Sequence, residues 1–291
     1  MSKNLSLMMT KTATNRGKWL EQASQYLKSN GIVTPQLDSE LILAHVLNVE
    51  RINLHTHPEA TLTIDEQKIA NRLLQKRAVS YPVAYITGQK EFFGYDFIVS
   101  PDVLIPRPET EELVEQAINI SKTIDARPIK IADVGCGSGV IGLSLSLELN
   151  QLEIPYRTTL SDIDPKALEI CRQNQIKLGA MNTKVIRNNL LENITEKYDI
   201  ITANLPYVST AWEIGAEVEF EPKSALFADD NGLTLISQLI DQIKDQRNLH
   251  PNGWLILESD PRQQKLITEK LQRNDFKNIK RTNYITAAQA H

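Results

Sequence analysis

The stretch Ile131-Ala-Asp-Val-Gly-Cys-Gly-Ser-Gly-Val-Ile-Gly142 decides the fold of this 291-residue chain. The apolar run from Ile129 to Val134 is typical of a buried strand, and glycines then follow at every second position. Apolar residues at helical spacing resume at Val140. A strand, a glycine-rich turn and a helix in this order bring a backbone close to a ligand at the N-terminus of the helix.

The glycine loop does not by itself identify its ligand. Gly137, Gly139 and Gly142 match the dinucleotide pattern G-x-G-x-x-G, and Asp162 follows about twenty residues later, where such sites place an acidic residue. The same layout serves S-adenosylmethionine, where an acidic residue after the second strand holds the ribose hydroxyls. The glycine loop and Asp162 are therefore compatible with either a dinucleotide or S-adenosylmethionine.

A second motif, Asn204-Leu-Pro-Tyr207, directly follows the apolar run Tyr198–Ala203, which predicts another buried strand. Ligands of doubly wound sheets bind outside the carboxyl ends of the strands. We therefore expect Asp162 and Asn204 to face the same crevice as the glycine loop. Asn-x-Pro-Tyr at this place resembles the Asn-Pro-Pro-Tyr signature of methyltransferases that modify planar amide or amine nitrogens.

Composition excludes several classes of protein. No run approaches the roughly 20 apolar residues of a membrane span, so no membrane association is expected. The polar N-terminus lacks a signal-peptide core, which predicts a cytoplasmic protein. The two cysteines lack C-x-x-C spacing, so we expect neither a disulfide framework nor a metal site.

The charge is unevenly distributed but small. Residues 1–85 carry 10 Lys and Arg against 7 Asp and Glu, whereas the remainder carries 22 against 29. An excess of this size is no nucleic-acid footprint. We therefore expect no direct nucleic-acid binding, and a protein partner fits at least as well.

The chain divides into three expected parts. Helical spacing near residues 19–30, 35–47 and 64–79 predicts a small helical domain over residues 1–84, after a polar start (1–15) expected to fray. A β-hairpin that turns at Gly94 occupies an expected linker over residues 85–106. Strands and helices then alternate over residues 107–291, which predicts an α/β fold with a mostly parallel, doubly wound sheet. We expect strands near 129–134, 156–162, 184–188, 198–203, 253–259 and 276–282, and helices near 109–123, 139–149, 165–178, 232–246 and 261–273.

From about residue 35 to 260, the chain resembles the release-factor glutamine methyltransferases of the HemK type. The stretches that carry the resemblance are Tyr85-Ile-Thr-Gly-Gln-Lys-Glu-Phe-Phe-Gly94, Leu104-Ile-Pro-Arg-Pro-Glu-Thr-Glu111, Asp133-Val-Gly-Cys-Gly-Ser-Gly139, Asp162, Asn204–Tyr207 and Phe220-Glu-Pro222. The resemblance implies a Rossmann-like sheet with helices on both faces and S-adenosyl-L-methionine as cofactor. It also implies that the substrate is a class-I peptide chain release factor, methylated on the glutamine of its Gly-Gly-Gln tripeptide.

The resemblance also implies roles for particular residues. The implied cofactor-binding residues are Asp133, Gly135, Cys136, Gly137, Ser138, Gly139, Asp162, Asn189, Leu190 and Asn204. The implied catalytic residues are Asn204, Leu205, Pro206 and Tyr207, where the Asn204 side chain and the residue-205 carbonyl accept the two N–H groups of the substrate amide. Three further residues either cap a helix or help to close the cofactor site: Arg107, Glu109 and Thr110.

The chain departs from the family pattern at three places. Leu205 replaces the family's first proline, and Asn189 replaces an acid beside the adenine. The tail Asn283–His291 lacks the clear final strand of such domains, which predicts an incomplete or unusual sheet edge. Two alternatives therefore remain beside glutamine methylation: an adenine N6-type nucleic-acid methyltransferase, and a catalytically silent S-adenosylmethionine-binding protein. A nicotinamide dehydrogenase ranks last, because no convincing hydride-transfer acid or base follows Asp162.

Overall fold

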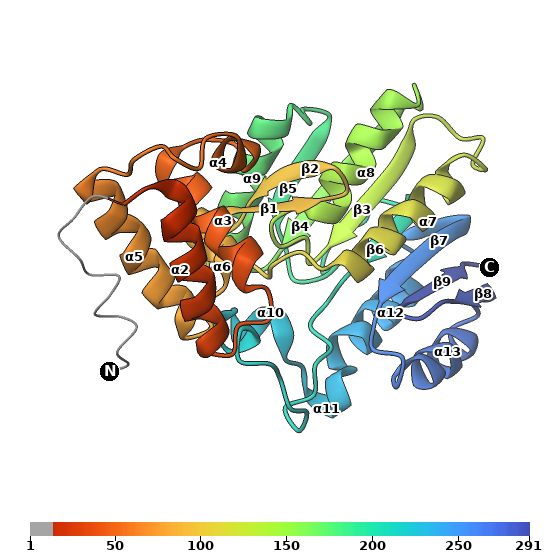
Figure 1. Cartoon of the computed structure of the whole chain (residues 1–291). Coiled ribbons are helices and arrows are strands. Elements are labelled where there is room, and N and C mark those ends of the chain that lie inside the picture. The colour runs from red at the N-terminus through yellow and green to blue at the C-terminus, as the bar shows by residue number, and fades with distance from the viewer. Residues whose placement is uncertain (1–13) are drawn as a thin grey trace. The chain divides into compact units, whose positions relative to one another are not determined.

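The computed structural model describes residues 14–291 (Figure 1). The chain forms two compact units: the first runs to Gly88 and includes Gly215–Phe220, and the second comprises Gln89–Ile214 and Glu221–His291. None of the helices in residues 14–291 is both long and apolar enough to cross a membrane.

The first unit is helical. Its elements are α2 (Arg16–Ser29), α3 (Pro35–Leu47), α4 (Ile52–Thr56), α5 (Ile64–Ala78), α6 (Val83–Thr87) and the short η2 (Val218–Phe220). A capping box formed by Thr63 and Glu66 starts α5, and Trp19, Leu27 and Leu74 are buried in one shared core. The expected helices are α2, α3 and α5, whereas α4 and α6 are too short to show periodicity in the sequence. The predicted fraying of residues 1–15 concerns mainly residues 1–13, which lie outside the described part.

The second unit contains a seven-stranded sheet with the order β5-β4-β3-β6-β7-β9-β8. Its strands are β3 (Ile129–Val134), β4 (Tyr156–Asp162), β5 (Thr183–Arg187), β6 (Tyr198–Ala203), β7 (Leu249–Glu258), β8 (Lys277–Arg281) and β9 (Ile285–Gln289). The pairs from β5 through β7 are parallel, and β9 runs antiparallel to both β7 and β8. The carboxyl ends of β3, β4 and β6 therefore lie at one edge of the sheet.

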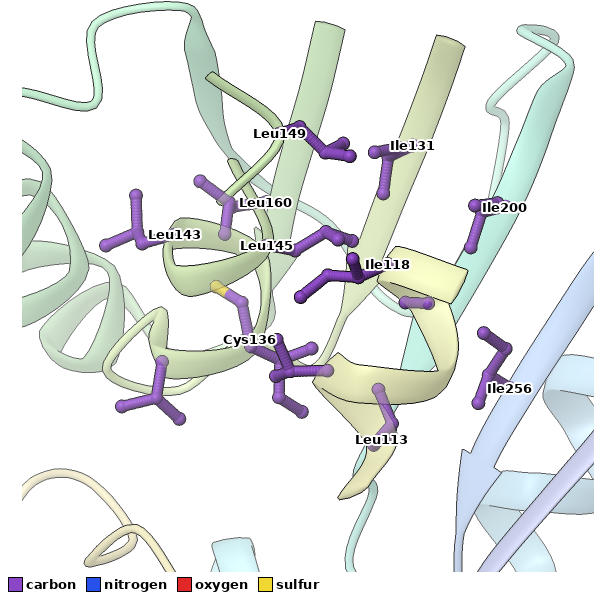
Figure 2. Packing of buried hydrophobic residues seen from close by; sticks show 14 of the residues in the cluster. Leu113, Ile118, Ile131, Cys136, Leu143, Leu145, Leu149, Leu160, Ile200 and Ile256 are labelled. Atoms are coloured by element: carbon purple, nitrogen blue, oxygen red, sulfur yellow. The ribbon is translucent and has the colours of Figure 1, made fainter. Parts of the chain in front are cut away.

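Helices cover both faces of this sheet, as expected. They are α7 (Glu111–Ser121) after the 3-10 turn η1 (Pro108–Thr110), α8 (Val140–Gln151), α9 (Pro165–Leu178), α12 (Thr234–Gln246) and α13 (Gln264–Arg273). The short helices α10 (Lys223–Leu226) and α11 (Asp229–Gly232) lie in the connection between β6 and β7. Neighbouring strand residues point to opposite faces. Ile131 packs with α7 and α8 (Figure 2), whereas Ala132 packs in the cluster that contains α12 and α13. The two cores hold the strand ends in fixed positions.

The expectation of an incomplete sheet edge was wrong. Residues 285–289 form β9, which is inserted between β7 and β8. Four of its five residues are buried, so the alternation of polar and apolar side chains that marks a half-exposed strand is absent. Its alanines fit a position with neighbours on both sides.

The hairpin consists of β1 (Gln89–Phe92) and β2 (Tyr95–Ile98) and turns through Phe93 and Gly94, both at positive φ. Phe92 and Phe97 are buried in the core formed by α7 and α8. The buried Asn174 on α9 accepts the Ile98 N–H at 2.6 Å and donates to the Ser138 carbonyl at 2.9 Å. One side chain thus connects the hairpin to the glycine loop.

Candidate active site

The glycine loop connects the end of β3 to the start of α8. Gly135, Gly137 and Gly139 have φ angles of 72°, 54° and 86°, in the left-handed region that favours glycine. The Gly135 N–H donates to the Ser161 carbonyl at 2.8 Å, which ties the loop to β4. A side chain at position 135 would place its Cβ only 2.7 Å from the Leu205 Cδ2 atom. Glycine is therefore required here for both conformation and space.

A pocket lies at the carboxyl ends of β3, β4 and β6, beside the glycine loop. The residues singled out from the sequence that line it are Arg107, Thr110, Gly135, Cys136, Gly137, Ser138, Asp162, Asn189, Leu190, Asn204, Leu205 and Pro206. Asp133, Glu109, Gly139 and Tyr207 do not line it. The sheet topology therefore brings the two sequence motifs to one cavity.

Asp162 ends β4 and contacts the loop directly. Its Oδ2 accepts the Gly137 N–H at 2.9 Å, and its Oδ1 accepts the Asp164 N–H at 2.9 Å. Burial is the largest influence on this carboxyl and raises its pKa. Each carboxylate oxygen has a second lone pair, so Asp162 can still accept hydrogen bonds from ligand hydroxyls.

Asp133 is fully buried behind the loop. Its Oδ2 accepts the Gly142 N–H at 2.9 Å, and its Oδ1 accepts the Thr202 hydroxyl at 3.1 Å. Burial raises the pKa of Asp133 to about 7, although both hydrogen bonds favour the ionised form. This side chain connects β3, α8 and β6 and does not reach into the pocket.

The segment Asn204–Tyr207 follows β6 and is held at several points. The Asn204 Nδ2 donates to the Thr110 hydroxyl at 3.3 Å. The Tyr207 hydroxyl donates to Glu258 Oε1 at 3.1 Å, and the Gln263 side chain donates to the Tyr207 carbonyl at 2.7 Å. Burial, followed by the charge of Glu258, raises the Tyr207 pKa, so this hydroxyl keeps its proton.

The segment before η1 is anchored by a buried carboxylate. Glu221 accepts the Ile105 N–H at 3.0 Å and forms an ion pair with Arg107. Arg107 is thereby held at the pocket wall. Glu109, in contrast, is exposed.

Comparisons with known proteins identify the family. Residues 18–88 match the model of the PrmC N-terminal domain, and residues 117–224 match that of the methyltransferase small domain. A release factor glutamine methyltransferase of Koribacter versatilis is 36% identical over 82% of this chain and 84% of its own length. The Salmonella typhimurium protein of the same name is 32% identical over 90% and 91%. The chain belongs to the release factor glutamine methyltransferase family.

Solved structures agree on the fold of this family member. The catalytic domain of hMettl16 in complex with MAT2A 3'UTR hairpin 1 matches with a TM-score of 0.52 and 14% identity, over 75% of this chain and 79% of that one. At this identity the likeness concerns the fold alone. Fold and family are those of the S-adenosylmethionine-dependent methyltransferases, so the chain is an enzyme of this class.

Sequence reasoning missed three side chains that hold the site of this methyltransferase: Glu258, Gln263 and Asn174. Glu258 is the last residue of a strand, just as Asp162 is, so the rule that placed Asp162 at the pocket could also have found Glu258. Glu221 was quoted within Phe220-Glu-Pro222, but its contact with Arg107 spans more than one hundred residues. Such a contact leaves no local signal in the sequence.

Asp133→Asn is expected to change how stability depends on pH. A carboxyl whose pKa rises from 3.8 to about 7 on folding binds more protons in the folded state, so it destabilises the fold increasingly as pH rises through this window. Relative to Asp133→Asn, which keeps an acceptor for Gly142, the wild type should lose up to about 1.4 kcal/mol of stability per pH unit. Urea unfolding of both proteins from pH 4.5 to 8 measures the difference, in which the contributions of ionisable groups far from residue 133 cancel. Parallel stability curves would contradict this expectation.

Proposed function

We propose that this enzyme transfers a methyl group from S-adenosyl-L-methionine to the side-chain amide nitrogen of the glutamine in the Gly-Gly-Gln tripeptide of class-I peptide chain release factors. The observation that carries the proposal is that Asn204, Leu205 and Pro206 of the Asn-Leu-Pro-Tyr motif line the same pocket as the glycine loop. The chain also aligns over most of its length with enzymes named for this reaction. A release-factor substrate also supports a cytoplasmic location.

The residues at the pocket fit S-adenosylmethionine. The glycine loop leaves space for the methionine end of the cofactor, and the Asp162 oxygens can accept the ribose hydroxyls. Leu190 and the exposed Asn189 line the pocket beyond Asp162, where the adenine would lie. Asn189, which replaces the family's acid, can still accept a hydrogen bond from the adenine amine through its uncharged side-chain oxygen. When bound, the cofactor supplies an activated methyl group on a sulfonium centre.

The chain's own contribution is to position the substrate amide. A glutamine amide nitrogen is a poor nucleophile, because its lone pair is delocalised into the carbonyl group. The Asn204 Oδ1 and the Leu205 carbonyl accept its two N–H groups and turn the nitrogen towards the methyl group. This nitrogen would receive the methyl group of the cofactor, which would leave as a neutral thioether, and the methylated nitrogen would release one proton to water. Orientation and fixed dipoles provide most of the acceleration.

The departure at Leu205 preserves this chemistry. The reaction uses the backbone carbonyl of residue 205, and Pro206 still restrains residue 205 to an extended conformation. The Leu205 side chain is 3% exposed and packs with Ala203, Leu190 and Leu233 in the core. The position of the segment is therefore set by packing instead of by a second proline ring.

Transfer of labelled methyl to purified release factor tests the proposal. The wild-type factor should be labelled, whereas a factor with Gln→Ala in the tripeptide should not. Total RNA and DNA serve as further acceptors in the same assay. Label on nucleic acid alone would replace the substrate by an adenine-type amine, and no label on any acceptor, despite cofactor binding, would indicate a silent binding protein.

A further inference from the structure

Glu258 is a buried carboxyl next to the reactive segment. It is the last residue of β7 and is 1% exposed. The parallel register pairs Ala203 with Leu257, so Asn204 and Glu258 follow side by side on adjacent strands. The Tyr207 hydroxyl occupies Oε1 at 3.1 Å, but the buried Oε2 atom has no hydrogen-bond partner. A buried carboxyl oxygen without a hydrogen-bond partner is unfavourable for folding, so its presence requires an explanation.

Donors surround this carboxyl. Burial raises the pKa of Glu258, and hydrogen-bonding influences from the Thr110, Tyr207 and Asn204 side chains oppose the rise. Thr110 and Asn204 thus lie close to Glu258, although neither has normal hydrogen-bond geometry with Oε2. The Asn204 Nδ2 also donates to Thr110. The NH₂ group of the Asn204 amide therefore faces the oxygens of Thr110 and Glu258, and the amide oxygen Oδ1 points away from them.

We propose that Glu258 is a positioning residue that fixes the orientation of the Asn204 amide, so that Oδ1 is presented to the substrate. In its ionised form, which the Thr110, Tyr207 and Asn204 side chains favour against burial, the Glu258 carboxylate can only accept hydrogen bonds. If the Asn204 amide turned over, its oxygen would face the Glu258 carboxylate, and its NH₂ group would meet the N–H donors of the substrate amide. Glu258 thus excludes the unproductive orientation. The inference rests on the proposed function, because it assigns Oδ1 to the substrate amide.

The same carboxyl also orients Tyr207. Because Oε1 accepts the tyrosine hydroxyl, Oε2 is the oxygen that remains for Asn204. This division explains why a carboxyl is useful at this position and an apolar side chain would not be. It also means that the amide of residue 204 and the carboxylate of residue 258 can be exchanged with each other while one hydrogen bond between them is kept.

The test exchanges the amide and the carboxylate. In Glu258→Gln, the new NH₂ group can donate to the Asn204 oxygen, so both amide orientations are satisfied and kcat should fall by about 100-fold, as expected for misplacement of a reacting group. In Asn204→Asp, two carboxylates face each other, and kcat should fall at least as far. The double variant Glu258→Gln/Asn204→Asp restores one donor between the two side chains and leaves an Asp oxygen for the substrate. Its kcat should return to within about tenfold of the wild type.

The readouts separate this inference from the proposed function. All four proteins are compared for kcat on release factor, affinity for S-adenosylhomocysteine and melting temperature. Rescue of kcat, with unchanged cofactor affinity, supports the inference; multiplicative losses in the double variant, or an unaffected Glu258→Gln, would overturn it. If the wild type labels no release factor, the proposed function fails. The melting temperatures then still decide whether residues 204 and 258 are coupled. If the change in melting temperature of the double variant equals the sum of the changes in the two single variants, the contact is refuted.

Discussion

Asn204→Ala is expected to lower kcat on release factor by about two to three orders of magnitude, the range measured when one preorganised polar group of an active site is removed. The variant loses one of the two acceptors proposed to orient the substrate amide. Affinity for S-adenosylhomocysteine should change by less than about threefold, because the loop hydrogen bonds from Gly135 and Gly137 do not involve Asn204. Steady-state turnover and calorimetric titration measure the two quantities separately.

A surface asparagine provides the control for this variant. Asn150 is exposed near the end of α8, and Asn150→Ala should leave both turnover and cofactor affinity unchanged. Parallel loss of turnover and cofactor affinity in Asn204→Ala would show that Asn204 mainly supports the cofactor or the fold. Unchanged turnover would remove Asn204 from the mechanism.

The convergence of the two motifs could be predicted from the sequence because it depends on a local rule. Each motif directly follows an apolar run, and the carboxyl ends of neighbouring parallel strands meet at one edge of a sheet. The structure places Gly137, Asp162 and Asn204 around one pocket accordingly. This prediction required only that the strands before the two motifs be assigned correctly, and the apolar residues in 129–134 and 198–203 indicated both strands.

The supporting contacts could not be predicted, because they depend on three-dimensional packing. Asp133 was expected to bind the cofactor, but its carboxyl accepts hydrogen bonds from Gly142 and Thr202 and does not line the pocket. Leu205 was interpreted through its backbone carbonyl and the loss of a proline, but its side chain also occupies the space beside Gly135, where a Cβ would lie 2.7 Å from the Leu205 Cδ2 atom. Sequence spacing predicts where a residue lies along a strand, but it does not predict whether the side chain at the strand end points into the pocket or into the protein behind it.

The second large effect is expected at Gly232, which lies against the Asn204–Tyr207 segment. It ends α11 with a φ of 83°, after two further residues in the left-handed region. An alanine Cβ at this position would lie 1.9 Å from the Tyr207 carbonyl oxygen and 2.5 Å from the Gln263 Nε2 atom. Since no Cβ tolerates such contacts, the Tyr207 carbonyl and the Gln263 side chain that holds it must both move.

Gly232→Ala should therefore affect both stability and turnover. We expect a loss of about 1–3 kcal/mol or more from overpacking, in addition to the cost of a left-handed alanine. Displacement of the reactive segment by about 1 Å should lower kcat by about 100-fold in the protein that remains folded. Thermal unfolding and turnover below the melting temperature measure the two effects.

Gly179→Ala is the matched control, because it separates backbone strain from the clash. Gly179 follows α9 with a φ of 69°, but a Cβ there would meet no atom within 4 Å. Both variants place alanine in the left-handed region and should share a cost of about 1 kcal/mol. Only Gly232→Ala displaces the carbonyl of Tyr207. If the two variants lose equal stability and Gly232→Ala keeps normal turnover, then the Asn204–Tyr207 segment does not depend on its contact with α11 for catalysis.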